Sequence, residues 1–158
     1  MSSLTHFDAD GRARMVDVGG KPETERLARA EGAVRLPRDA FDQVADGRSR
    51  KGNVAPVAEL AGIMAAKRTS ELIPLCHPLP LSSVRVTVTS DPALPGFRVT
   101  AEAKTSGRTG VEMEALTAVS VACLTIYDML KALTHDIRIE GVALTEKRGG
   151  KSGVWQRS

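Results

Sequence analysis

The amino-acid sequence predicts an α+β fold of the ferredoxin-like kind, a four-stranded antiparallel sheet in βαββαβ order with two main helices on one face. Two segments, 54–67 and 110–131, have the composition of helices. Two others, 84–89 and 97–104, alternate apolar and polar side chains as half-buried strands do. With a strand before and a strand after them, the order from residue 27 onward is strand, helix, strand, strand, helix, strand.

Size and charge favour one domain that binds a small anion. The chain has 158 residues, of which 42% are hydrophobic, so we expect a single domain over 1–158 with an N-terminal extension at 1–26 and a basic tail at 147–158. Aromatic residues make up only 3%, too few for a stacking platform that binds single-stranded nucleic acid. The net charge of +3 suits an anionic small molecule and is too weak to predict DNA binding.

Cysteine content and apolar run lengths predict a cytoplasmic protein. The two cysteines, Cys76 and Cys123, lie far apart in the chain, and no framework of paired cysteines is visible. The N-terminus lacks the apolar region of a secretory signal. No run reaches the roughly 18 apolar residues that a membrane span needs.

The N-terminal part of the chain predicts loops followed by one strand. Residues 15–18 indicate a short extended segment, and the glycines at 19–20 indicate a turn. Helix propensity at 25–31 conflicts with strand-like alternation at 33–36. We favour one extended strand that ends at Pro37, because proline cannot continue the hydrogen-bond ladder.

A short helix over 38–45, a turn at 46–47 and a basic loop at 48–52 come next. Asn53 can cap the helix at 54–67. Four apolar residues recur on one face of that helix, and we expect this face in the core: Val57, Leu60, Ala61 and Met64.

Three prolines stiffen the apolar stretch 72–81, which carries Cys76 and His77 at its centre. Adjacent side chains on an extended chain point to opposite faces, so a cysteine nucleophile with a histidine base is disfavoured here. Two ligand types without further Cys or His are weak support for a metal site. Two interpretations of His77 stay open: a partly buried histidine with its hydrogen bonds satisfied by the protein, or a histidine that contacts the substrate.

The two alternating segments form a hairpin around a turn at 91–96. A glycine-rich loop at 105–110 then leads into the long helix, and backbone amides at such a helix start can hold an anion. Glu112 and Glu114 follow within one turn and would compete with a phosphate for that position.

The helix predicted at 110–131 is almost uncharged at its centre and would be about 33 Å long. Asp128 and Lys131 stand three residues apart near its end, so they share one face. On a buried helix the two side chains must either pair with each other or have a function, because unpaired buried charge is costly. Spacing alone favours an ion pair that closes the last turn.

The C-terminal part predicts a turn at 134–136, a strand from 137 and a bulge at Gly141, where the alternation shifts register. Residues 150–152 are similar to the end of a phosphate-binding loop. Thr145 stands where that loop requires glycine, and no helix follows, so we reject a nucleotide triphosphatase loop and expect a flexible basic tail.

Several motifs together cover nearly the whole chain and are long enough to be highly specific. They are residues 15–18 with Lys21, Thr24 and Arg26, then 51–52, 61–69, 72–79, 109–118, 126–128 and 149–153. This set resembles the cyclic pyranopterin monophosphate synthase family, the accessory protein C family of molybdenum cofactor (molybdopterin) biosynthesis. Asn53 departs from the aspartate expected in many relatives, but it can still cap its helix.

The resemblance implies a lyase that converts a GTP-derived substrate, cyclised dihydro-GTP, to cyclic pyranopterin monophosphate by acid/base catalysis and releases pyrophosphate. It implies no metal and no redox cofactor. It also implies that an upstream radical SAM GTP cyclase supplies the substrate. The assembly implied is a homohexamer built as a trimer of dimers, and closed symmetric assemblies are the usual form.

By motif match, the resemblance implies roles for three groups of residues. The acid/base candidates are Asp128, Lys131 and Lys51. The candidates for substrate contacts are Leu75, Cys76, His77, Met113, Glu114 and Glu112. The candidates for triphosphate contacts are Lys21, Arg26, Lys67, Arg68 and Lys147. A positioned carboxylate and amine suit repeated proton transfers, burial can lower the pKa of a lysine, and cations stabilise a departing pyrophosphate.

The positions of Glu114 and Asp128 indicate a shared site. They are 14 residues apart, about 21 Å on one straight helix, which is too far for one compact substrate head. Either the helix begins after Glu114 or the two ends of a site come from different subunits, and we favour a subunit interface.

Two other functions compete with the synthase. One is a non-catalytic, ferredoxin-like module that binds nucleotides or phosphates through its basic loops, which predicts binding without turnover. The other is a scaffold that delivers substrate to the radical enzyme, which predicts product formation without Asp128 or Lys131.

Overall fold

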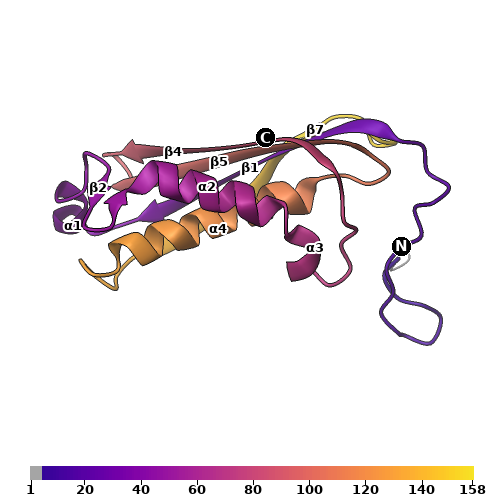
Figure 1. Ribbon diagram of the computed structural model, residues 1–158, viewed down its shortest axis with the longest axis horizontal. Coiled ribbons are helices and arrows are strands. Elements are labelled where there is room, and N and C mark those ends of the chain that lie inside the picture. Colours follow the sequence, from indigo (N-terminus) through magenta and orange to yellow (C-terminus); the bar gives the residue numbers. More distant parts are fainter. Residues whose placement is uncertain (1–4) are drawn as a thin grey trace.

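Two long helices cover one face of a five-stranded antiparallel sheet in the computed structural model of the chain (Figure 1). The structure describes residues 5–158. The sheet has the order β4-β5-β1-β6-β7, and its strands are β1 (Thr24–Arg35), β4 (Leu81–Asp91), β5 (Gly96–Gly107), β6 (Arg138–Arg148) and β7 (Trp155–Gln156). The helices are α1 (Arg38–Asp42), α2 (Val54–Ala66), α3 (Thr69–Leu72) and α4 (Glu112–Leu130). A separate two-stranded ribbon consists of β2 (Arg48–Ser49) and β3 (Gly52–Asn53).

The long elements β1, α2, β4, β5, α4 and β6 follow the predicted chain order. The sheet, however, has five strands where four were predicted, because β7 pairs with Glu146 and Lys147 of β6. The amide of Arg157 also donates to the carbonyl of Thr145 at 2.9 Å. The expectation of a flexible tail was therefore wrong: the chain turns back after β6 and satisfies part of that strand's open edge.

The strand interpretation of the segment before Pro37 is confirmed. β1 pairs with β5 along one edge and with β6 along the other, and this two-sided hydrogen bonding overrides the helix propensity of residues 25–31. The register between β1 and β6 shifts between Glu31 and Ala33, where Gly141 has φ of +63°. The predicted bulge at Gly141 is thus also confirmed.

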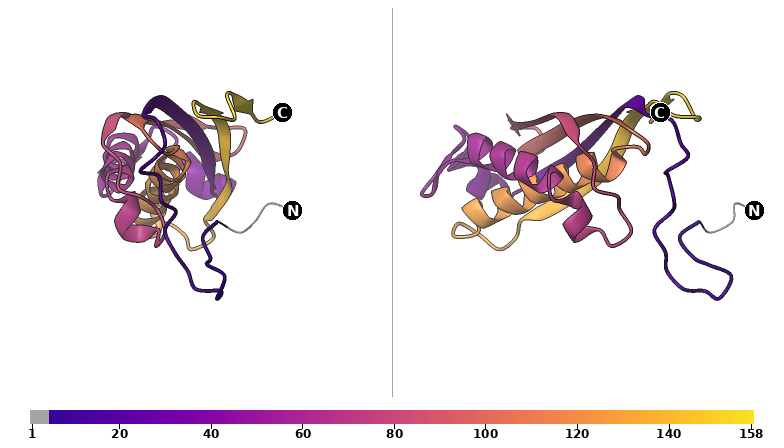
Figure 2. Two further views of the ribbon diagram at one scale, coloured as in Figure 1. Left: turned by 90° about the vertical axis from the view of Figure 1, so that its right-hand side faces the viewer. Right: turned by 45° about the vertical axis from the view of Figure 1, so that its right-hand side comes forward.

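The core lies between the sheet and the helix pair, and the opposite face of the sheet is bare (Figure 2). Along β1, Ala28 and Ala30 are buried beneath the helices, whereas Arg29 and Glu31 point the other way. α2 and α4 approach closely at Gly62, where an added Cβ would lie 2.8 Å from the carbonyl oxygen of Ala118. Small residues at this crossing allow both helices to reach the sheet.

The prediction for the buried face of α2 was wrong. Val57, Leu60 and Met64 are 45%, 58% and 53% exposed. The residues that face the core are mostly small: Val54, Ala58, Gly62, Ala65 and Ala66. Asn53 precedes the helix as predicted, but its side chain makes no capping hydrogen bond. The larger apolar side chains stand on the outer surface because only small ones fit between the closely packed layers.

α4 spans Glu112–Leu130, two residues later at its start than predicted. It is the one helix among residues 5–158 that is long and apolar enough to cross a membrane. It packs against α2, β1, β5 and β6, as the core helix of a folded body does.

The remaining local predictions have mixed outcomes. The turns at 19–20 and 46–47 are present. α1 ends at Asp42, earlier than the predicted helix, and residues 105–107 belong to β5 and not to a loop. The N-terminal segment from residue 5 runs away from the body and contains one isolated bridge, between Phe7 and Ala13 (Figures 1 and 2). Residues 1–4 of the predicted extension lie outside the described residues.

Candidate functional site

The C-terminal end of α4 brings the three acid/base candidates together. The Asp128 carboxylate accepts from both lysines: Lys131 Nζ lies 2.8 Å from Oδ1, and Lys51 Nζ lies 3.0 Å from Oδ2. Lys51 Nζ also donates to the backbone carbonyl of Asp128 at 3.1 Å. The cluster therefore joins α4 to a loop that lies 77 residues earlier in the chain.

The ribbon of β2 and β3 holds Lys51 in place. The Ser49 hydroxyl accepts from the Lys51 amide and donates to the Gly52 carbonyl, both at 3.1 Å. Gly52 has φ of +109°, a conformation that favours glycine, so it lets the chain turn tightly after Lys51. The tight turn directs the lysine towards α4.

The acid/base cluster is open to solvent, contrary to the expectation of burial. Side-chain exposures are 56% for Asp128, 50% for Lys131 and 49% for Lys51. Hydrogen bonds from Lys131 and then Lys51 lower the pKa of Asp128. The hydrogen bond to Asp128 raises the pKa of Lys131, so the expectation of a pKa lowered by burial was wrong for this chain. At neutral pH Asp128 is a carboxylate, and Lys131 is an ammonium group that can donate a proton.

A cavity of about 450 Å³ lies at the other end of α4. Three segments line it: the N-terminal segment, the proline-rich stretch after α3 and the start of α4. The lining includes Val16, Val18, Lys21, Ile73, Leu75, Cys76, His77, Thr109, Gly110, Glu112 and Met113. Five of the predicted substrate contacts line this cavity: Leu75, Cys76, His77, Glu112 and Met113. The sixth, Glu114, is in contact with the Cys76 thiol. The sequence interpretation missed Val16, Val18, Ile73, Thr109 and Gly110 because their positions follow from tertiary packing.

Cys76 and His77 both line the cavity but contact different groups. Cys76 Sγ lies 3.8 Å from Glu114 Oε1, and His77 Nε2 lies 2.6 Å from the carbonyl oxygen of Val16, to which it donates. The histidine thus ties the N-terminal segment to the cavity rim. Among residues 5–158 no group of three or more His, Cys, Asp or Glu is arranged to hold a metal ion.

Glu114 is only 3% exposed, and its Oε2 has no hydrogen-bond partner within residues 5–158. Burial raises the pKa of this carboxyl group. An unsatisfied buried oxygen is costly, so it indicates a place where a ligand donor fits.

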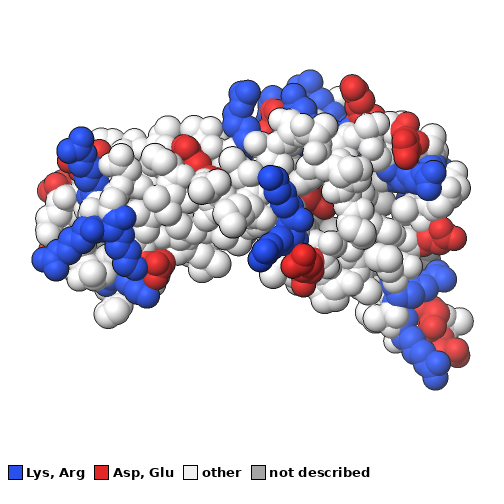
Figure 3. All heavy atoms as spheres, in the orientation of Figure 1, with Lys and Arg blue, Asp and Glu red and all other residues white. Residues whose placement is uncertain are grey.

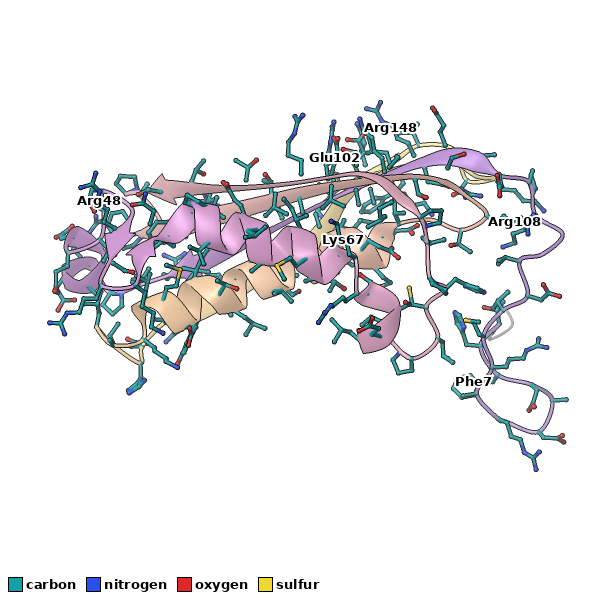
Figure 4. All side chains as sticks on the ribbon, viewed as in Figure 1. Phe7, Arg48, Lys67, Glu102, Arg108 and Arg148 are labelled. Atoms are coloured by element: carbon teal, nitrogen blue, oxygen red, sulfur yellow. The ribbon has the colours of Figure 1, made fainter. Side chains whose placement is uncertain are left out.

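Ion pairing at the start of α4 involves Glu112 and Lys147. Glu112 Oε1 lies 2.6 Å from Lys147 Nζ, and its carboxylate folds back over Gly110, where an added Cβ would lie 2.1 Å from Oε2. Glu112 therefore occupies the position in which the helix N-terminus would hold an anion. Lys67 and Arg68 stand exposed between α2 and α3, and Figure 4 shows the position of Lys67.

The reactivity of Cys76 gives a test of this end of the site. Burial, followed by the charge of Glu114, raises the pKa of the Cys76 thiol to about 11. Alkylation by iodoacetamide should therefore still accelerate at pH about 10, where an ordinary thiol of pKa near 8.5 has levelled off. Glu114→Gln should lower that pKa and speed the reaction. Peptide mass spectrometry measures each rate, with the fully buried Cys123 as unreacted control, and a plateau below pH 9 would contradict the buried Cys76–Glu114 contact.

Comparison with known proteins gives one consistent result. The model of the MoaC family matches residues 15–150. A cyclic pyranopterin monophosphate synthase of Cereibacter sphaeroides is 60% identical over 158 residues, which cover 100% of this chain and 99% of that protein. A protein of the same name from Methylobacterium nodulans is 60% identical, and the match covers 99% of this chain and 98% of that protein. Another, from a second Methylobacterium species, is 61% identical, and the match covers 98% of this chain and 97% of that protein.

Proposed function

The chain belongs to the MoaC family, and we infer that it acts as a cyclic pyranopterin monophosphate synthase in molybdenum cofactor biosynthesis. The observation that carries this function is the full-length likeness to synthases of that name. The enzyme is a lyase that rearranges cyclised dihydro-GTP into the pterin product and releases pyrophosphate. Its upstream partner is a radical SAM GTP cyclase, and its compartment is the cytoplasm.

Asp128 and the two lysines beside it carry the proton transfers in this proposal. The carboxylate, kept ionised by its neighbours, accepts protons, and the ammonium groups donate them. The same positive groups stabilise charge that develops on the departing pyrophosphate. The cavity at the start of α4 binds the ring system, with Leu75, Cys76, His77, Met113 and Glu114 as contacts and Lys21, Lys67, Arg68 and Lys147 near the phosphates.

One substrate cannot reach both clusters of a single chain. α4 includes both Glu114 and Asp128, so the alternative of a helix that begins after Glu114 does not apply. Their separation along the helix is about 21 Å. We therefore place each complete site between two subunits, with α4 of one antiparallel to α4 of the other, so that the C-terminal cluster of one chain meets the cavity of its partner.

The outer face of the helix pair supports this arrangement. Leu124 of α4 is 58% exposed, and the side chains Val57, Leu60 and Met64 are exposed on α2, which packs against α4. Figure 3 shows that the middle of this face is mostly uncharged, with one acidic side chain at its upper edge, while most Lys, Arg, Asp and Glu gather towards its ends. An apolar patch with a polar rim is typical of a subunit interface. Three such dimers give the proposed homohexamer.

Leu60→Glu should break this interface. It places a charge at the centre of the proposed apolar contact, and burying an unpaired charge is costly, so the variant should fold but lose the dimer contact, with a smaller mass than the wild type and no synthase activity. Analytical ultracentrifugation measures the mass. Glu71→Ala, an exposed substitution on α3 and not on α2 or α4, is the control and should keep the wild-type mass. A Leu60→Glu variant with the wild-type mass would contradict the proposed dimer.

The fold also belongs to this proposal. We propose that residues 1–158 form one domain of ferredoxin-like arrangement, to which β7 adds an edge strand. The order β4-β5-β1-β6 with α2 and α4 on one face supports this.

The test of function is turnover. Purified chain is supplied with cyclised dihydro-GTP from a radical-enzyme preparation, and cyclic pyranopterin monophosphate and pyrophosphate are quantified. We expect both products in equal amounts. Substrate that binds and stays unchanged would favour the non-catalytic binding module.

A further inference from the structure

Three distant segments meet at the side chain of Arg26. Arg26 stands on β1, and its Nε donates to the carbonyl of Gly107 at the end of β5, at 3.3 Å. The guanidinium lies against the main chain of Gly150, in the turn that follows β6: an added Cβ there would lie 2.2 Å from Nη1 and 3.2 Å from Cζ. The guanidinium therefore has the turn on one side and the strand end on another.

The two glycines of this turn have a steric reason to be glycine. Gly149 has φ of +97°, and an added Cβ would lie 2.2 Å from the carbonyl oxygen of Glu25 and 3.3 Å from Arg26 Cα. Gly150 has φ of +77°. Gly153, in the same connection, has φ of +63°, but nothing lies within 4 Å of its added Cβ. The turn thus touches Arg26 at 149–150 and is free of contacts at 153.

Arg26 differs in charge balance from most other arginines of the sheet, although Arg85 of β4 also lacks a salt bridge within residues 5–158. Arg29, Arg35, Arg98 and Arg148 each pair with a carboxylate. Within residues 5–158, Arg26 forms no salt bridge, and the bond to the Gly107 carbonyl is the one hydrogen bond of its side chain. A guanidinium has five N–H donors, so most of this group's donors and its full charge stay available.

Arg26 also faces the proposed site. It stands two residues before Ala28, which is buried beneath the helices, so both side chains lie on the helix side of the sheet. Ala28 pairs with Lys147, whose ammonium group meets Glu112 at the cavity. Arg26 is not among the residues that line this cavity, but its contact with Gly107 puts it at the end of β5, from which residues 108–111 lead to the cavity at the start of α4.

We propose that the Gly149–Gly150 turn is a positioning element that holds the Arg26 guanidinium in one orientation for a substrate phosphate group. Gly150 itself contributes no charge and acts through Arg26. This inference rests on the proposed function, since a triphosphate substrate provides the anion. A bidentate guanidinium–phosphate contact depends on orientation, so a displaced Arg26 binds less tightly even though its charge is kept.

The experiment is a double-mutant cycle of Gly150→Ala and Arg26→Ala, with Gly153→Ala as the matched control. Gly153→Ala introduces the same left-handed backbone strain without the Arg26 contact. Two quantities are measured for each folded variant: KM and kcat for cyclised dihydro-GTP, and the Kd of inorganic pyrophosphate by calorimetry. Arg26→Lys, which keeps the charge and loses the planar group, gives a second approach if Gly150→Ala does not fold.

Gly150→Ala and Arg26→Ala should each raise KM and the pyrophosphate Kd by roughly tenfold, the loss of one charge-assisted contact, with little change in kcat. The double variant should be no worse than Arg26→Ala alone. Gly153→Ala should match wild type, and Arg26→Lys should behave like Arg26→Ala.

Additive effects of the two substitutions, equal effects of Gly150→Ala and Gly153→Ala, or a wild-type Kd in Arg26→Lys would each overturn the positioning role. So would a wild-type chain that does not bind pyrophosphate. A chain that makes no product but shows the non-additive pyrophosphate pattern would overturn the proposed function and leave the positioning role standing.

Discussion

Asp128→Asn should abolish turnover and leave substrate binding nearly intact, with kcat reduced by about 10²–10⁴-fold, the usual contribution of a general acid or base. The amide keeps the size of the side chain but cannot accept a proton from the substrate. It also leaves Lys51 and Lys131 without the carboxylate that aligns them. Product formation from cyclised dihydro-GTP gives kcat, and calorimetry gives the affinity for pyrophosphate.

The control for Asp128→Asn is Asp42→Asn, which removes a comparably exposed carboxylate that faces Arg38 on α1. This control should keep wild-type kcat. Product formation by Asp128→Asn at the wild-type rate would contradict the acid/base role of Asp128 and favour a scaffold that only delivers substrate.

The pH profile adds a second readout for the same carboxylate. Since Lys131 lowers the pKa of Asp128, the wild-type carboxylate stays ionised, and active as a base, until the pH falls below the ordinary carboxyl range. Lys131→Met should raise that pKa, so the acid limb of residual activity should move to higher pH.

Two inactive variants should restore activity to each other when they are co-expressed. In a dimer of Asp128→Asn with Glu114→Gln, one site contains both defects and the other contains neither, if each site joins the two ends of α4 from different chains. With random pairing about half of the dimers are mixed, so roughly a quarter of wild-type activity should return. Specific activity of the purified mixed protein is the measurement.

The matched control for complementation is a mixture of Asp128→Asn with Lys51→Ala. Asp128 and Lys51 contact each other within one chain, so they belong to the same site. Each of the two sites of a mixed dimer then contains one of the two substitutions, and the mixed dimer should stay inactive. Equal recovery in the two mixtures would contradict the assignment of Asp128 and Lys51 to one site. No recovery in the first mixture would place each complete site within a single chain. It would then contradict the subunit interface even if Asp128→Asn behaves as expected.

Local sequence patterns predicted much of the molecule. The alternation of 84–89 and 97–104 located β4 and β5, and the register change at Gly141 located a bulge that the structure contains. Spacing placed Asp128 and Lys131 on one face of α4, where they form an ion pair. These features depend on near neighbours in the chain, so a periodic pattern is enough to define them.

The wrong predictions share a cause, which is that burial depends on what packs against an element. Leu60 and Met64 are apolar at helical spacing, yet they are exposed, because the buried side of α2 has room for mostly small side chains. β7 was missed because its two residues become a strand only by pairing with β6. Asp128 was expected in the interior, but it lies on the outward face of the last turn of α4, whose Met129 and Leu130 are buried, and its side chain is 56% exposed.

The sequence by itself determined the family, the order of the long elements and the identity of the candidate acid/base residues, because these are written in motifs and short-range spacing. Only the tertiary structure showed how Lys51, which the family resemblance put beside Asp128, contacts that carboxylate, that Glu112 pairs with Lys147 and that Arg26 lies against the turn at 149–150. Each of those contacts connects segments dozens of residues apart. Their geometry is therefore set by how the sheet and the helices pack, and no local pattern records it.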